Sequence, residues 1–104
     1  MSVPRGATPT FTLTFPEETQ IDLTQARSVY VTFSRGMTAL TKTGEDLTVG
    51  QRSIGVFLSQ EETLGFGIGD VEVQANWLTA NDKRVVSEIA TVAFTKQLLD
   101  EVIT

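Results

Sequence analysis

Neighbouring carboxylates are the residues in this sequence whose types and spacing come closest to those of a catalytic site. Glu61 and Glu62 lie side by side between an apolar run and a glycine-rich segment. A pair of carboxyl groups can supply a general acid and a nucleophile or base, as in glycoside hydrolysis. That chemistry needs another acid across a deep cleft, and Asp46, Asp70 and Glu72 are the available candidates.

A structural role accounts for the same acids. Ser59 precedes Glu62 by three residues, which is the capping-box pattern of a helix amino terminus. Acids in the first turn also favour the positive end of the helix dipole, and Gly65 and Gly67 would end the helix. The sequence therefore predicts one short helical turn near residues 59–65 that joins two strands.

Two residue types that most enzymes depend on are missing. The 104 residues include no histidine and no cysteine, so neither a Ser-His-Asp unit nor a disulfide nor a thiolate metal site can form. The segment GFGIGD lacks the Lys-Ser/Thr of a phosphate loop, and TKTGEDLTVG is too short for an EF-hand. We predict a protein that is not an enzyme, with no catalytic residues, cofactor or metal.

The charge and hydropathy of the chain limit its partners. Net charge is −5, which disfavours phosphate backbones and anionic membrane surfaces. No apolar run reaches the length of a membrane span, and the first residues do not resemble a secretory signal. We expect a soluble protein that is made in the cytoplasm and binds neither nucleic acid nor membranes.

The apolar residues mostly alternate with polar ones, which is typical of half-buried strands. The side chains expected to face inward are Phe11, Leu13 and Phe15; Val29, Val31 and Phe33; Ile54, Val56 and Leu58; Val71, Val73, Ala75 and Trp77; and Ala90, Val92 and Phe94. A short strand near Ala39–Lys42 should pair with the Val31 strand through a turn at Gly36. The segment LTANDKRVV predicts a hairpin. Short strands at this spacing favour an antiparallel sandwich or barrel in a single domain, residues 1–104.

The two ends of the chain have different compositions. Residues 1–9 hold Pro4, Arg5, Gly6 and Pro9, so they favour an extended arm that either frays or reaches a neighbouring subunit. Near the other end, apolar side chains follow helical spacing at Leu98, Leu99, Val102 and Ile103. They would either cover an open end of the core or form an apolar patch for a partner.

Five segments in order carry a resemblance to a known group of proteins. They are VPRGATPTFTLTF, VYVTFSRG, LSQEETLGF, VQANWL and LLDEVI. Together they resemble small phage and prophage proteins of Gram-positive bacteria that open with Pro-Arg-Gly-Thr-Thr-Pro-Thr, carry a Leu-Thr-Gln-Glu-Glu-Thr-Leu stretch, and end near Glu-Val-Ile. Ala7 and Ser59 depart mildly from that wording. The chain is also similar in size and style to the β-rich amino-terminal module of some baseplate upper proteins.

The resemblance implies a structural protein of the virion tail or baseplate, made in the host cytoplasm. We expect an all-β, immunoglobulin-like antiparallel sandwich of about seven strands that assembles with other phage structural proteins or with itself. Contacts between subunits at the two ends of the chain would explain why the group has fixed sequences there. The partner-binding candidates are Pro4, Arg5, Gly6, Leu99, Val102 and Ile103.

Two other functions stay open at this point. A carbohydrate- or host-surface-binding module would present exposed aromatic side chains in a shallow groove, for which Tyr30 and Phe57 are candidates. A small hydrolase would need two carboxylates that face each other in a cleft.

Overall fold

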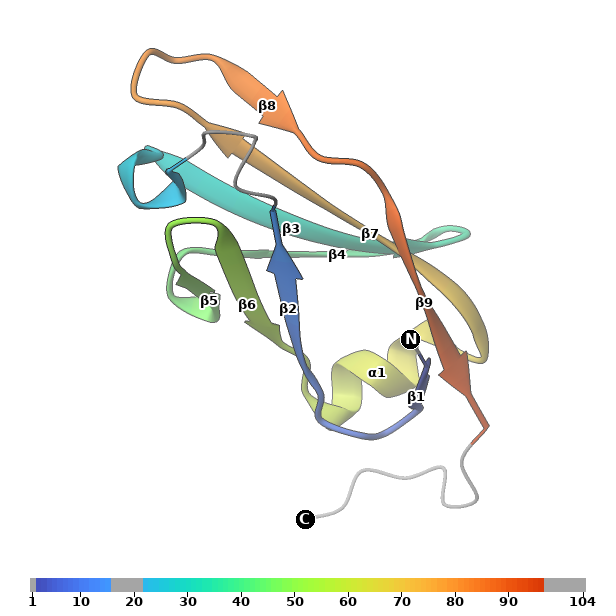
Figure 1. Ribbon diagram of the computed structural model, residues 1–104. Coiled ribbons are helices and arrows are strands. Elements are labelled where there is room, and N and C mark those ends of the chain that lie inside the picture. Colours follow the sequence, from blue (N-terminus) through green and yellow to red (C-terminus); the bar gives the residue numbers. More distant parts are fainter. Residues whose placement is uncertain (1, 16–21, 97–104) are drawn as a thin grey trace.

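The computed structural model of the protein describes residues 2–15 and 22–96 (Figure 1). These residues form nine strands: β1 (Ser2–Pro4), β2 (Thr10–Thr14), β3 (Ser28–Arg35), β4 (Thr38–Thr43), β5 (Leu47–Val49), β6 (Ser53–Phe57), β7 (Gly69–Leu78), β8 (Arg84–Val86) and β9 (Ala90–Thr95). They also form one α-helix, α1 (Gln60–Phe66), and two short 3₁₀ helices, η2 (Leu23–Gln25) and η3 (Gly44–Asp46). Among the described residues, no helix is long and apolar enough to cross a membrane.

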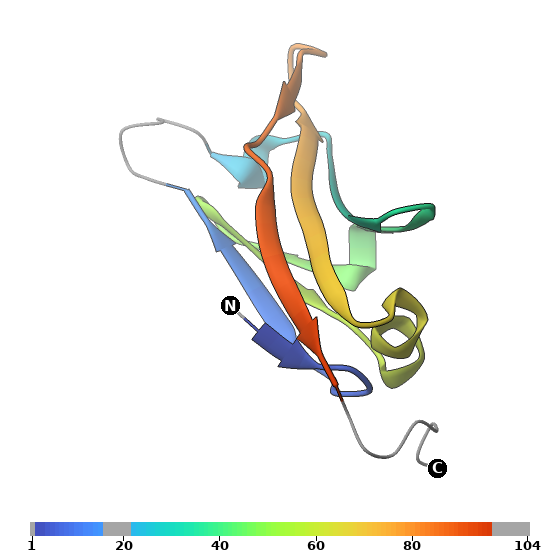
Figure 2. The ribbon, with the colours of Figure 1, turned by 90° about the vertical axis from the view of Figure 1, so that its right-hand side faces the viewer.

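The strands form two sheets, which pack around one hydrophobic core. The larger sheet has the order β1-β9-β7-β3-β4, and β8 pairs with β7; the smaller sheet has the order β2-β6-β5. Figures 1 and 2 show the smaller sheet lying across one face of the larger one, with α1 at the end of the molecule that also holds β1. The fold is therefore β-rich, as the sequence predicts.

The alternating pattern correctly predicts which side chains face the core. Phe11, Val31, Val56, Val73 and Trp77 are all buried. Burial of a large apolar side chain contributes about 2 kcal/mol, so these inward faces supply much of the driving force for closing the two sheets.

The last strand has the predicted register, with one exception. Val92 and Phe94 are buried, whereas Ile89 is 56% exposed. Ala90 is exposed, although the pattern places it inward, because it lies at the first position of β9, before the strand is fully covered.

Aromatic rings connect the two sheets with α1. The rings of Phe11 and Phe33 lie 5.8 Å apart between their centroids, across the two sheets. Phe66 at the end of α1 is 6.4 Å from Phe33 and meets the ring of Phe94 edge to face at 5.6 Å. The helical turn is thus fixed to the core through its last residue.

Both predicted hairpins are confirmed. β3 and β4 pair antiparallel through a turn in which Gly36 has a φ of 58°, a conformation that glycine adopts without strain. β7 and β8 pair through the turn that follows Leu78. The backbone N–H of Ser87 then donates to the carbonyl of Ala75, and the Ser87 hydroxyl accepts from the N–H of Ala75. After this contact the chain pairs with β7 again as β9.

The prediction of purely antiparallel pairing is wrong for β1. This strand pairs in parallel with β9, and Val3 lies opposite Phe94. Parallel strands cannot be joined by a tight turn, so a pairing between the two ends of the chain leaves no local signal in the sequence. The estimate of about seven strands is also too low, because β1, β5 and β8 have three residues each and are too short to show alternation.

Candidate functional site

The amino-terminal arm is seated on its own chain. Val3 is buried, while Pro4 is exposed at the end of β1. The backbone N–H of Arg5 donates to the carbonyl of Thr95 at 3.0 Å, and its guanidinium Nη2 donates to the carbonyl of Leu64 at 2.7 Å. The arm therefore joins β9 to the last turn of α1, in place of the frayed terminus that composition alone allows.

A buried threonine holds the next part of the arm. Thr63 is fully buried, and its hydroxyl donates to the carbonyl of Ala7 at 2.9 Å and accepts from the N–H of Gly6 at 3.0 Å. Gly6 has a φ of 83°, so this turn requires glycine or a strained residue. Nothing in the sequence pattern marks Thr63, because it is a polar residue on the inner side of a very short helix.

The predicted partner-binding residues divide into two groups. Arg5 and Gly6 come together with α1, and Pro4 lies beside them on the surface. Leu99, Val102 and Ile103 lie outside the described residues. Contact of the arm with another subunit stays a prediction. Binding to α1 within the same chain is an additional role of Arg5 and Gly6.

The capping box predicted at the acidic stretch is confirmed. The Ser59 hydroxyl accepts from the N–H of Glu62 at 3.2 Å, and the Glu62 carboxylate accepts from the N–H of Ser59 at 2.8 Å. The second oxygen of Glu62 lies 2.6 Å from the Lys42 amine. Gly67 ends the helix with a φ of 75°.

The electrostatics of Glu62 fit a structural acid. Partial burial pushes the pKa of this carboxyl upward, but hydrogen bonds from Lys42 and from the Ser59 backbone outweigh burial and hold the pKa below its usual value. A catalytic acid would need the opposite shift. Within residues 2–15 and 22–96, no group of three or more acids is placed to hold a metal ion.

The outer face of the larger sheet carries a groove of about 360 Å³. It is lined by Ser28, Tyr30, Thr32, Thr41, Asn76, Trp77, Leu78 and Arg84, which come from β3, β4, β7 and β8. Tyr30 is 42% exposed there. Trp77 itself is buried, as the alternating pattern predicts.

The two aromatic candidates for a binding platform do not share a face. Phe57 is exposed but belongs to β6 of the smaller sheet, whereas Tyr30 belongs to β3 of the larger one. No pattern in the sequence marks the polar neighbours of Tyr30 as binding residues. Asn76 lies opposite Tyr30 in the ladder, and Arg84 binds Asn76 from the far side of the hairpin.

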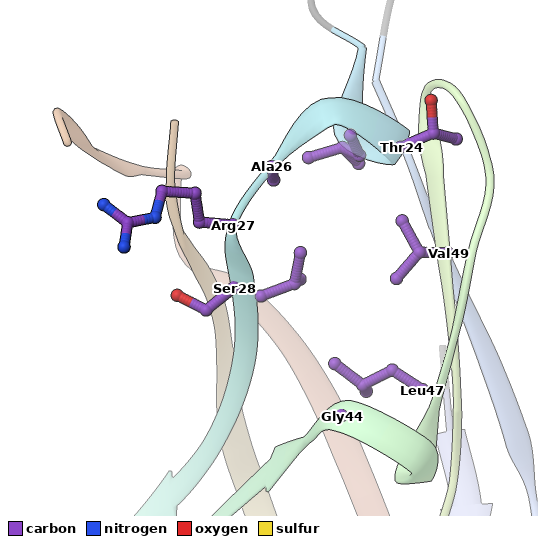
Figure 3. Close-up of a pocket in the computed structure, with 9 residues that line it drawn as sticks. Thr24, Ala26, Arg27, Ser28, Gly44, Leu47 and Val49 are labelled. Atoms are coloured by element: carbon purple, nitrogen blue, oxygen red, sulfur yellow. The ribbon is translucent and has the colours of Figure 1, made fainter. Parts of the chain in front are cut away.

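A second pocket, of about 380 Å³, lies between the sheets near η2 and η3. Figure 3 shows Leu47 and Val49 pointing into it, while Arg27 and Ser28 point away. The guanidinium of Arg27 forms an ion pair with Asp82 on the β7–β8 turn. The pocket is therefore lined mainly by apolar groups and has no obvious polar group to orient a ligand.

Strand β4 forms one edge of the larger sheet. With six residues it is the longest edge strand in the described part of the chain, since β1, β5 and β8 have three each and β2 has five. No strand among the described residues pairs with its outer edge. Its one charged residue, Lys42, is turned to Glu62, and its side chain is only 13% exposed.

Comparisons with protein-family models, with curated proteins and with solved structures found no match for this chain.

Proposed function

We propose that this chain is a non-enzymatic structural module of a phage tail or baseplate that acts through protein–protein assembly. The assignment to phage rests on the resemblance of the five ordered segments. The partners would be a second copy of the chain or other structural proteins of the same particle, and the site of action would be the virion.

We further propose that the fold is an immunoglobulin-like sandwich of the variable type. Named in chain order, β3, β7 and β9 correspond to strands C, F and G, and β4 corresponds to the added strand C′. β2, β5 and β6 correspond to strands B, D and E of the opposite sheet. The chain differs from antibody domains in having no disulfide and in carrying its tryptophan on β7.

The edge of β4 is the observation that carries the assembly proposal. An unpaired edge presents a row of N–H and C=O groups that a strand from another chain can bind. Natural proteins often block such edges with an exposed lysine, a proline or a bulge. β4 contains no proline, and the charge of Lys42 is engaged by Glu62 and not displayed at the edge.

A matched pair of lysine variants tests this edge. Ala39 on β4 lies opposite Ser34 on β3 in the ladder, so both side chains emerge from the same face one strand apart. We expect wild type to associate as its concentration rises in sedimentation velocity, Ala39→Lys to stay monomeric, and Ser34→Lys to behave as wild type. Equal association of Ala39→Lys and wild type would contradict a role of this edge in assembly, and a wild type that is monomeric at millimolar concentration would contradict pairing between two copies of the chain.

The phage assignment has a separate test. A gene position among tail genes would support it, whereas a position within a metabolic operon would contradict it and leave the strand-edge proposal intact.

A further inference from the structure

We propose that the groove on the outer face of the larger sheet, defined here as the Tyr30 groove, binds a saccharide that carries a carboxylate. This site is independent of the β4 edge pairing proposed above, because it uses side chains on the sheet face and not backbone groups. Its volume of about 360 Å³ suits one or two sugar rings.

The register of the strands places the residues that line the groove in three adjacent rows of cross-strand neighbours. Tyr30 lies opposite Asn76, Thr32 lies opposite Thr41, and Arg84 lies opposite Leu78. The central strands β3 and β7 hold most of these positions, so the lining is fixed by ladder hydrogen bonds. A binding site on such rigid elements loses little entropy when it binds a ligand.

Asn76 is held in a single orientation. Its Oδ1 accepts from Arg84 Nε at 3.2 Å and from Arg84 Nη2 at 3.0 Å. Among the described residues, no acceptor binds the Asn76 Nδ2 amide or the Arg84 Nη1. Both groups are donors, so the pair offers hydrogen bonds to a ligand rich in oxygen acceptors.

Tyr30, Trp77 and Leu78 supply the apolar part of the groove. Tyr30 is 42% exposed there, whereas Trp77 is buried. An exposed ring with a polar tip can pack against the C–H face of a sugar while its hydroxyl stays hydrated. Aromatic contact beside hydrogen-bond donors is the combination that a pyranose ring needs.

The floor of the groove favours a polyol over a phosphate. The hydroxyls of Thr32 and Thr41 lie 3.1 Å apart, and that of Ser28 lines the same groove. A hydroxyl both donates and accepts, which matches sugar hydroxyls, whereas a phosphate offers acceptors alone.

Charge favours an acidic sugar. Arg84 is the one charged residue that lines the groove in the described structure. This cation stands out on a chain of net charge −5. One guanidinium with a free edge can pair with one carboxylate.

Titration with a galacturonic acid tetramer tests the proposal, with the neutral galactose tetramer and polyglutamate as comparison ligands. Chemical shifts in β3, β7 and β8 should change saturably with the acidic tetramer, and the other two ligands should bind at least about tenfold more weakly. Absence of binding at millimolar concentration, equal binding of the neutral tetramer, or equal binding of polyglutamate would each overturn the proposal.

Two variants locate the site. Asn76→Asp keeps the shape and the contact with Arg84 but turns the outward donor into an anion, so binding of the acidic tetramer should disappear. Tyr30→Ala should weaken binding by about tenfold. The matched controls Phe57→Ala and Lys83→Gln remove an exposed aromatic and a charge outside the groove, and near-ultraviolet dichroism checks the fold of each. Unchanged affinity in Asn76→Asp, or the same loss in Phe57→Ala as in Tyr30→Ala, would overturn the assignment.

Discussion

Two regions of this molecule carry clusters of polar side chains, and they use them in opposite ways. Around α1, the polar groups of Ser59, Glu62 and Thr63 bind partners within the chain. Around Tyr30, Asn76 and Arg84 are fixed against each other, yet each keeps a donor that faces no acceptor in the described structure. We call the first cluster closed, because its polar groups bind one another or the backbone, and the second open, because it keeps donors that no group of the described structure binds.

The contrast separates structural polar residues from candidate recognition residues. Chemical type does not distinguish them, because the acidic stretch appeared the better candidate for chemistry in the sequence. What distinguishes them is whether the hydrogen-bonding capacity is used up inside the fold. Substitutions in the closed cluster should therefore change stability, and substitutions in the open cluster should change binding alone.

Thr63→Val should produce the largest loss of stability. The substitution keeps the shape of the side chain but leaves the Gly6 N–H without its acceptor and the Ala7 carbonyl without its donor. Burial without a hydrogen bond costs about 1–3 kcal/mol for each group, so with two groups affected the free energy of unfolding should fall by at least about 2 kcal/mol in a urea titration. Thr43→Val, at an exposed position in β4, is the control. A loss no larger than that of Thr43→Val would show that the hydrogen bonds of Thr63 to the arm do not stabilise the fold.

Glu62→Gln should have an intermediate effect. It weakens the capping box and removes the ion pair with Lys42, for a cost of about 1 kcal/mol at neutral pH. Glu61→Gln, at the neighbouring exposed position, is the matched control and should change the midpoint of thermal unfolding very little. Equal effects of the two variants would contradict a structural role for Glu62 alone.

The contribution of Glu62 should also depend on pH. Because the fold lowers the pKa of this carboxyl below its ordinary value of 4.5, its stabilisation is full above that pH. The stabilisation is lost as the pH falls through the lower pKa of the folded state. Wild type and Glu62→Gln should therefore differ in unfolding free energy at pH 7 and converge below pH 4.5. A difference that grows as the pH falls would mean that the sign of the pKa shift is wrong.

Asn76→Asp should have the smallest effect on stability. The side chain is at the surface of the groove, and the new carboxylate can still accept from Arg84. We expect the free energy of unfolding, measured in a urea titration, to change by less than about 0.5 kcal/mol. A loss as large as that of Thr63→Val would place Asn76 in the structural class and remove the contrast.

The sequence predicts the parts of this fold that depend on local pattern. Alternation places Val31 and Val73 in the core, and the spacing of Ser59 and Glu62 predicts the cap of α1. Each of these signals is contained within a few residues of the chain.

The features that the sequence does not reveal depend on contacts between distant segments. β1 pairs with β9 across nearly the whole chain, and Thr63 holds an arm that lies 56 residues away at Ala7. Asn76 and Arg84 meet only when the hairpin register is known. Residue type alone could not show that one polar cluster closes on itself and that the other stays open.

The central functional claim is that the arm is bound within one chain while the edge of β4 is open to a partner, and hydrogen exchange of the isolated chain at low and at high protein concentration tests it most directly. We predict that the amides of Arg5 and Gly6 are protected at both concentrations, because Thr95 and Thr63 accept from them within one chain. Amides of β4 that face its open edge should exchange rapidly in the dilute protein and become protected in the concentrated protein. The account would be contradicted if the arm gained protection only at high concentration while β4 did not change.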